Sequence, residues 1–219
     1  MLVDNCEFPS SAYFDVENDV WLKEIGPSRC RVGITSVLVF LAGRLKKVGL
    51  KTELKQVDAG QMIGSIESSR YFGAVRSPVR GEISAFNLEL LKEPRPVIES
   101  PYEEGWFAEI VGYDESSLSR LYIGEAARPK LEARIKELKV KCLRALPDEE
   151  MFSIGTECAT TLANLSELVS DKPTGFVVHL VTDDPTASIE MVRWVDQTGN
   201  ELVEERKEDK LFHFLVRKA

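Results

Sequence analysis

Short segments of β-branched and aliphatic residues dominate the first half of the chain, and they constrain the fold more than any other feature. Turn residues such as Gly26-Pro27, Asp58-Ala59-Gly60 and Ser77-Pro78 separate these segments. Many short strands with regularly spaced turns are typical of a β-barrel or a β-sandwich. The predicted strands span residues 19–23, 30–34, 45–50, 52–57, 62–67, 72–76, 82–86 and 106–111.

A helix is predicted over residues 129–146. Apolar residues recur there at steps of three and four, which places them on one face of a helix. Pro129 suits the first turn, where its missing N–H costs nothing. The apolar face consists of Leu131, Ile135, Leu138, Cys142 and Ala145, so we expect Cys142 to be a core residue.

The last 70 or so residues alternate between helical and strand patterns. Helices are predicted over 158–169 and from an acidic cap at Asp183-Asp184-Pro185 through Val195, and strands over 176–182, 201–205 and 211–216. This alternation favours a small two-layer α/β sandwich. From Asp148 onward the chain has 15 acidic and 7 basic residues, whereas the first 147 residues are neutral overall. The sequence therefore predicts an α+β protein with domains 1–147 and 148–219.

Composition excludes several functions. A net charge of −8 over 219 residues argues against nucleic-acid binding. No apolar run is long enough for a membrane helix, and no signal peptide is evident. The two histidines, His179 and His213, lie within apolar strands and are expected to be structural, so no metal site is predicted.

The cysteines predict a reduced protein. None of Cys6, Cys30, Cys142 and Cys158 forms a C-x-x-C motif. Cys6 lies in an apparently unstructured terminus, and no disulfide partner is evident. A cytoplasmic location is the expectation.

An ordered set of motifs runs through the first domain. The motifs are Val32-Gly33-Ile34-Thr35, Gly64-Ser65-Ile66-Glu67-Ser68, Ser77-Pro78-Val79-Arg80-Gly81-Glu82-Ile83, Asn87, and Pro101-Tyr102-Glu103-Glu104-Gly105-Trp106-Phe107. Over residues 13–146 the chain resembles the H protein of the glycine cleavage system, a carrier of lipoic acid. The resemblance implies a lipoyl-type β-barrel or sandwich with a C-terminal helix.

In that family a lysine at a β-hairpin tip carries the lipoyl group, and the resemblance places Arg70 at that position. A guanidinium stays protonated and cannot form the amide. No lysine lies between Lys55 and Lys92, so the resemblance predicts a chain without lipoate as cofactor. Arg70 is expected to be either an anion contact or a solvated residue at a former lipoyl site.

Residues 35–44 depart from the family, whose helix at this place is polar. Here the segment is apolar on all sides, so both faces must be covered. Val37, Phe40 and Leu41 are the candidate partner-binding residues. The second domain, another subunit or a protein partner is the candidate cover.

The second domain resembles the small TusA-like sulfur carriers. The matching residues are Gly175 to Thr182, Asp183-Asp184-Pro185-Thr186, the final strand, and Ile154-Gly155-Thr156-Glu157-Cys158. In that family the cysteine carries a persulfide, and the resemblance makes Cys158 the candidate reactive residue. The two prolines that follow the family's cysteine are absent here, where the sequence reads Cys158-Ala159-Thr160-Thr161.

Opposing effects act on Cys158. A helix N-terminus stabilises a thiolate, which is the form that attacks a sulfur donor. Glu157 beside it has the opposite effect. Alternatively, Cys158 is a small core residue on the same face as Leu162 and Leu165.

Two functions remain open. The first is a non-lipoylated H-protein-like carrier in a sulfur relay, with Cys158 as persulfide carrier and sulfur donors, sulfur acceptors or lipoate-type enzymes as partners. Its sulfurtransferase activity is left open. The second is a non-catalytic scaffold derived from two decayed carrier domains.

Overall fold

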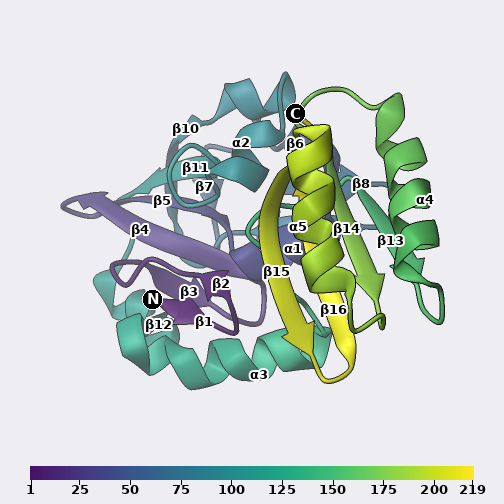
Figure 1. Ribbon diagram of the computed structural model, residues 1–219. Helices are drawn as coiled ribbons and strands as arrows, with labels where there is room; N and C mark the ends of the chain where they lie inside the picture. The colour runs from purple at the N-terminus through teal and green to yellow at the C-terminus, as the bar shows by residue number, and fades with distance from the viewer. The chain divides into compact units, whose positions relative to one another are not determined.

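The computed structural model describes all 219 residues and divides the chain into two compact units, Met1–Cys142 and Leu143–Ala219. Figure 1 shows their helices and strands. The prediction placed the joint at Pro147-Asp148, a few residues later. We describe each unit separately.

Unit 1 contains a seven-stranded sheet with the order β12-β3-β4-β5-β11-β10-β7. Its neighbouring strands are antiparallel. Most of the predicted strands are confirmed, but the strand predicted over 52–57 is reduced to β7. The strands are β3 (Tyr13–Asp15), β4 (Val20–Gly26), β5 (Arg29–Ile34), β7 (Gln56–Val57), β10 (Gly81–Phe86), β11 (Trp106–Val111) and β12 (Tyr122–Ile123).

A second sheet of three strands has the order β6-β8-β9. Its strands are β6 (Leu45–Leu50), β8 (Met62–Ser68) and β9 (Phe72–Arg76). One hydrophobic core draws on both sheets, for example Val32 and Ile110 from the first sheet and Ile66 from the second. This shared core is the physical basis of the sandwich. Short helical segments lie between the strands along the chain. They are η1 (Leu88–Leu91), α2 (Arg95–Glu99), η2 (Glu115–Arg120) and η3 (Gly124–Ala127).

Helix α1 (Ser36–Ala42) is covered from within unit 1. An N-terminal strap, residues 1–8, forms the small hairpin of β1 (Leu2–Val3) and β2 (Cys6–Glu7). Together with α3 (Arg128–Leu138), the strap contributes to a second core that contains Val37. The chain thus buries this apolar helix with two segments that the sequence did not identify as its cover.

Cys6 and Cys142 form a disulfide that closes a sequence separation of 136 residues. The prediction of a reduced protein with an unstructured, unpaired Cys6 is wrong, because Cys6 is disulfide-bonded and fully buried in the second core. The predicted helix over 129–146 is too long. Helix α3 ends at Leu138, after which Lys139 adopts a left-handed conformation with φ 53°. Cys142 is a core residue, as predicted, but it lies beyond the helix.

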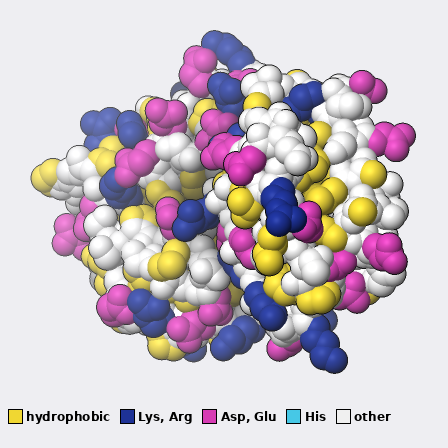
Figure 2. Space-filling model, viewed as in Figure 1, with side chains coloured by type: hydrophobic (Ala, Val, Ile, Leu, Met, Phe, Trp, Pro, Cys, Tyr) yellow, Lys and Arg dark blue, Asp and Glu magenta, His cyan; other side chains and the backbone are white.

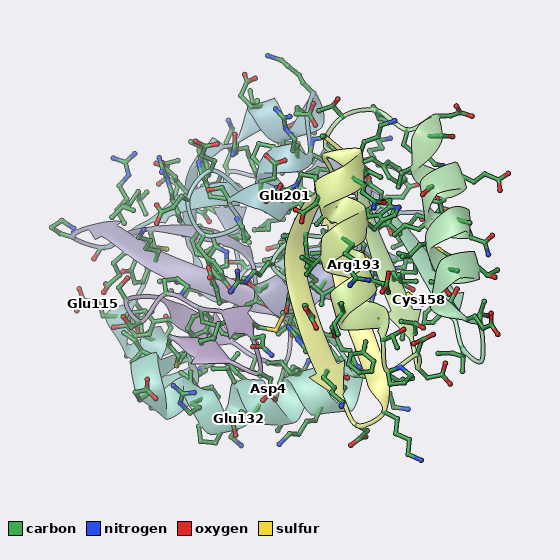
Figure 3. The ribbon with its side chains drawn as sticks, viewed as in Figure 1. Asp4, Glu115, Glu132, Cys158, Arg193 and Glu201 are labelled. Carbon is green, nitrogen blue, oxygen red and sulfur yellow. A yellow bond between two sulfur atoms is a disulfide. The ribbon has the colours of Figure 1, made fainter.

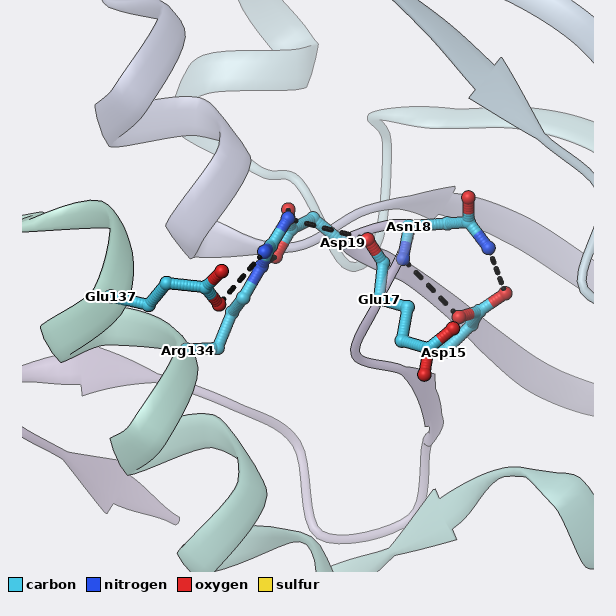
Figure 4. Close-up of polar contacts among 6 residues, drawn as sticks. All are labelled: Asp15, Glu17, Asn18, Asp19, Arg134 and Glu137. Atoms are coloured by element: carbon cyan, nitrogen blue, oxygen red, sulfur yellow. Dashed lines mark hydrogen bonds and ion pairs between the residues drawn. The ribbon is translucent and has the colours of Figure 1, made fainter.

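Long-range polar contacts fix α3 on the sheet. The guanidinium of Arg134 forms an ion pair with Asp19, with Nη2 2.7 Å from Oδ2. Figure 4 shows this pair, the bond of Arg134 to Glu137, and the neighbouring Asp15–Asn18 contact. Both charges of the Asp19–Arg134 pair are largely buried, so removing one partner leaves the other uncompensated.

A close approach of backbone to side chain explains one glycine of the sequence motifs. A Cβ atom on Gly33 would lie 2.6 Å from the indole ring of Trp21. Trp21 is buried, and its Nε1 donates a hydrogen bond to Pro101 O at 3.1 Å. A side chain at position 33 would therefore displace this ring.

Unit 2 contains a four-stranded sheet with the order β13-β14-β16-β15. β13 pairs with β14 in parallel, and the other pairs are antiparallel. Its elements are β13 (Glu149–Ser153), α4 (Cys158–Ser170), β14 (Val177–Thr182), α5 (Ala187–Thr198), β15 (Glu201–Glu208) and β16 (Leu211–Arg217). No residue range was predicted for β13, because its acidic Glu149-Glu150 start has no apolar strand pattern.

Both helices of unit 2 contribute to one core on one face of the sheet. Leu165 of α4 and Met191 and Trp194 of α5 pack with residues of β14 and β16 such as Leu180 and Phe214. Trp194 Nε1 also donates a hydrogen bond to Ser166 Oγ at 2.8 Å, which joins the two helices.

His179 and His213 lie on adjacent strands, are buried, and bond to each other with Nε2 3.0 Å from Nδ1. This contact agrees with the structural role predicted for them.

Candidate functional site

The first candidate site is the tip of the β8–β9 hairpin, around Arg70. Ser68 Oγ accepts hydrogen bonds from the backbone N–H groups of Arg70 and Tyr71, at 3.2 and 3.0 Å. The same hydroxyl donates to Ala42 O at 2.7 Å. One serine therefore closes the tip and attaches it to the last residue of α1.

The side chain of Arg70 folds back onto the same helix end. Its Nη2 donates to Phe40 O at 2.8 Å, where carbonyl groups at the C-terminus of a helix attract cations. Gly43 follows α1 with φ 74°, and a Cβ there would approach Arg70 Nε to 2.9 Å. Arg70 is exposed, as expected of a solvated residue, and its guanidinium also caps α1. An anion contact at Arg70 stays a prediction.

The predicted partner-binding residues differ in exposure. Val37 has no exposed surface, because the strap and α3 cover it, so it cannot contact a partner. Phe40 and Leu41 are half-buried against the same core. A partner role for Phe40 and Leu41 stays a prediction.

The second candidate site is the beginning of α4. Figure 3 shows Cys158 in the first turn of this helix. Its thiol is free of disulfide bonds and only partly exposed, and the side chain packs against the unit 2 core. The two aspartates before α5 reach this place: Asp184 Oδ2 accepts from Cys158 N at 2.9 Å, and Asp183 Oδ1 accepts from Gly155 N at 2.8 Å.

The aspartate pair has a different role from the predicted cap. α5 begins at Ala187, not at the proline, and Asp184 Oδ1 accepts from Thr186 N at 2.7 Å. The Asp184 carboxylate thus joins the starts of both helices. Its hydrogen bonds from Thr186 and Cys158 hold its pKa below the usual range.

These contacts suppress the thiolate of Cys158. Burial raises the pKa of the thiol, and the negative charges of Asp184 and Glu190 raise it further, while Thr186 acts in the opposite direction. The direction agrees with the expectation from Glu157, but the responsible carboxylates are more than twenty residues away in sequence. The burial and the two carboxylates therefore favour the protonated thiol over the thiolate.

The outer side of α5 carries apolar side chains. Figure 2 shows hydrophobic atoms on the face that carries α5, where Ile189 and Val192 are exposed.

No group of three or more His, Cys, Asp or Glu side chains is arranged to hold a metal ion. None of the helices has both the length and the apolar character needed to cross a bilayer.

Unit 1 is thus a two-sheet domain that presents an exposed hairpin tip and packs α3 into its second core. The family model of the glycine cleavage H-protein matches residues 12–134, which include the tip. The chain belongs to the glycine cleavage H-protein family.

Relatives extend this assignment. The chain is 34% identical over 142 residues to a probable glycine cleavage system H protein 2 of Saccharolobus solfataricus, with 64% of this chain and 96% of the relative covered. Identity is 35% to the corresponding protein of Sulfurisphaera tokodaii, with 65% and 97% covered. It is 33% to glycine cleavage system H protein 2 of Aquifex aeolicus, with 63% and 86% covered.

A crystal structure of an H protein from Mycobacterium marinum has a TM-score of 0.43 and 26% identity, and it matches 51% of this chain and 96% of its own length. The identity of the reactive groups at the two candidate sites is a separate question from family membership.

Sequence reasoning missed the groups that surround both sites. At the tip it missed the carbonyl of Phe40, and at α4 it missed Asp184 as a neighbour of Cys158. One signal could have helped at the tip. Gly43, just after an apolar helix, indicates a helix C-terminus whose last carbonyl groups need hydrogen-bond donors. No local pattern pointed from Asp184 to Cys158.

Proposed function

We propose that this protein is a partner-binding member of the H-protein family that carries no lipoyl group of its own. The main observation in support of this proposal is the hydrogen bond from Arg70 Nη2 to Phe40 O. A side chain that is permanently charged and bound to a helix end offers no nucleophile and no free arm at the tip.

The rest of the tip supports binding rather than chemistry. The hairpin is held to α1 through Ser68, and the sheet behind it is packed on the main core. A rigid, exposed hairpin is suited to docking, because little conformational freedom is lost on association. The partners in this proposal are enzymes of the lipoate type, and the proposed location is the cytoplasm.

Intact-mass measurement and peptide mapping of the full chain from its native cells test the proposal. We expect no lipoyl group on any lysine and a co-purifying protein that also binds the purified chain in a two-component titration. A lipoylated lysine would refute the absence of the group. A chain that binds no protein under mild cross-linking would refute the docking role.

A second candidate function is a sulfur relay through Cys158, in the TusA-like manner that unit 2 resembles. The observation in its favour is a free, partly exposed thiol in the first turn of a 13-residue helix. In this reaction the Cys158 thiolate attacks the outer sulfur of a donor persulfide. A new S–S bond forms at Cys158, the S–S bond of the donor breaks, and the donor leaves as a thiolate.

Persulfide loading of the full chain tests this candidate. Wild type and Cys158→Ser are incubated with a low-molecular-weight persulfide, and the peptides are mapped by mass. The relay predicts one added sulfur on the Cys158 peptide and none on the variant. Equal loading of both proteins, or none of either, contradicts it. The raised pKa of Cys158 is the reason that we rank the relay second.

A further inference from the structure

Phe72, the first residue of β9, is the most exposed large hydrophobic side chain of the chain, at 73%. An isolated exposed apolar residue needs no explanation, but an aromatic ring this exposed on a rigid strand is unusual. Its neighbours decide what it can bind.

Phe72 stands in a row across the three-stranded sheet. Its register partner on β8 is Glu67, and the partner of Glu67 on β6 is Lys47. Side chains of directly paired residues point to the same face of a sheet. All three are exposed, whereas the next row, Val48 and Ile66, faces the core. The ring therefore lies on the outer face of the sheet.

Two lysines lie on the same sheet as this ring, on β6, with Glu67 of β8 between Lys47 and Phe72. Lys46 occupies the bulge between Leu45 and Lys47, and both lysines are exposed. Arg70 lies at the tip, two residues before Phe72, and it keeps its positive charge while it donates to Phe40 O. We call Lys46, Lys47, Arg70 and Phe72 the tip surface. With Glu67 it has three positive charges and one negative charge on a protein whose net charge is −8.

We propose that the tip surface is a docking site for an acidic protein partner that offers an apolar pocket to Phe72. This inference rests on the proposed partner-binding function and names the surface and the partner chemistry. An aromatic anchor surrounded by charges is the usual composition of an energetic centre with a polar rim. The cations supply attraction and orientation toward an acidic surface.

The observations favour a protein over other anionic partners. A polybasic membrane site uses about four to eight clustered cations, whereas the tip surface has three, with the carboxylate of Glu67 beside them. A single aromatic ring would insert little apolar area into a bilayer. Nucleic acid is disfavoured by the net charge of −8.

The experiment uses the full chain with a photo-crosslinking phenylalanine analogue at position 72, expressed in the native cells. The crosslinked protein is identified and purified, and its affinity is measured by titration at low and high salt. The test variants are Phe72→Ser and Lys46→Glu/Lys47→Glu. The matched controls are Leu88→Ser, at a side chain that is 54% exposed, and Lys55→Glu, at an exposed lysine before β7.

We expect an acidic partner whose affinity falls about tenfold or more with either test variant and hardly with the controls. Affinity should also fall as salt rises. All changed side chains are exposed, so thermal melts of the four variants should match wild type. If a test variant melts early, the salt dependence of the wild-type affinity takes its place as the test. An affinity that does not change with salt counts against the proposal.

Three outcomes overturn the inference. In the first, Phe72 crosslinks to a second copy of this chain. In the second, the chain binds phosphatidylserine vesicles in place of a protein. In the third, a partner binds the test variants with the same affinity as wild type. In the last case the chain still binds a partner and the proposed function survives. A wild-type chain that binds no partner refutes the proposed function itself.

Discussion

The hairpin tip at Arg70 and the start of α4 at Cys158 are opposites. At the tip an exposed hairpin is present, while its residue Arg70 cannot act as a nucleophile. At α4 a nucleophilic residue is present, while burial and the carboxylates of Asp184 and Glu190 raise the pKa of its thiol. The reactivity of the tip is limited by the identity of residue 70, and the reactivity of Cys158 is limited by its surroundings. Different kinds of substitution should therefore restore reactivity at the two sites.

The largest expected effect comes from Arg70→Lys. If identity alone limits the tip, this variant should accept a lipoyl group from a lipoate-attaching enzyme, whereas wild type should accept none. Intact mass and peptide mapping provide the measurement. An unmodified Arg70→Lys chain would mean that the tip geometry is unsuitable as well, and the comparison would fail.

The second effect concerns the region behind the tip, where the strap covers α1. Cys6→Ser/Cys142→Ser should reduce the free energy of unfolding by about 2–5 kcal/mol, because the disulfide closes a very long loop. Denaturant unfolding of the oxidised proteins measures this loss. The reductant-treated wild type is the control and should behave like the double variant. Equal stability of oxidised wild type and variant would show that the strap holds without the bond.

The third effect tests the environment of Cys158. Asp184→Asn removes a negative charge that raises the thiol pKa, so more thiolate is present near neutral pH and alkylation should be several-fold faster. The pH profile of the rate should move to lower pH. Asp183→Asn is the matched control, because Asp183 bonds to Gly155 instead. An unchanged profile in Asp184→Asn would contradict the electrostatic account.

The smallest effect is the capping of α1 by Arg70. Arg70→Met removes one exposed hydrogen bond to a helix end and should cost at most about 1 kcal/mol of stability. Lys46→Met, at an exposed lysine in the β6 bulge, should leave stability unchanged. Thermal melts of the two variants compare these values. Equal melts of both would show that the Arg70 contact adds nothing.

Some of the fold could be predicted because it is encoded locally. The strands at Leu45–Leu50, Phe72–Arg76 and Trp106–Val111 were predicted with their observed bounds, since apolar periodicity and turn residues act over a few positions. The motifs of the first domain also identified the family that the comparisons show. The end of α3 was missed, because Lys139 stops the helix without a glycine or proline.

The amino-acid sequence by itself determined the β-rich character of unit 1, its family, and the presence of arginine at the hairpin tip. Only the tertiary structure decided how these residues behave. It brings Cys6 to Cys142, Arg70 to the carbonyl of Phe40, and Asp184 to Cys158. Each of these contacts joins residues at least 26 positions apart, and no local pattern specifies such a pair. The cover of α1, its capping by Arg70 and the raised pKa of Cys158 depend on such contacts, because burial and neighbouring charge are properties of the packed chain.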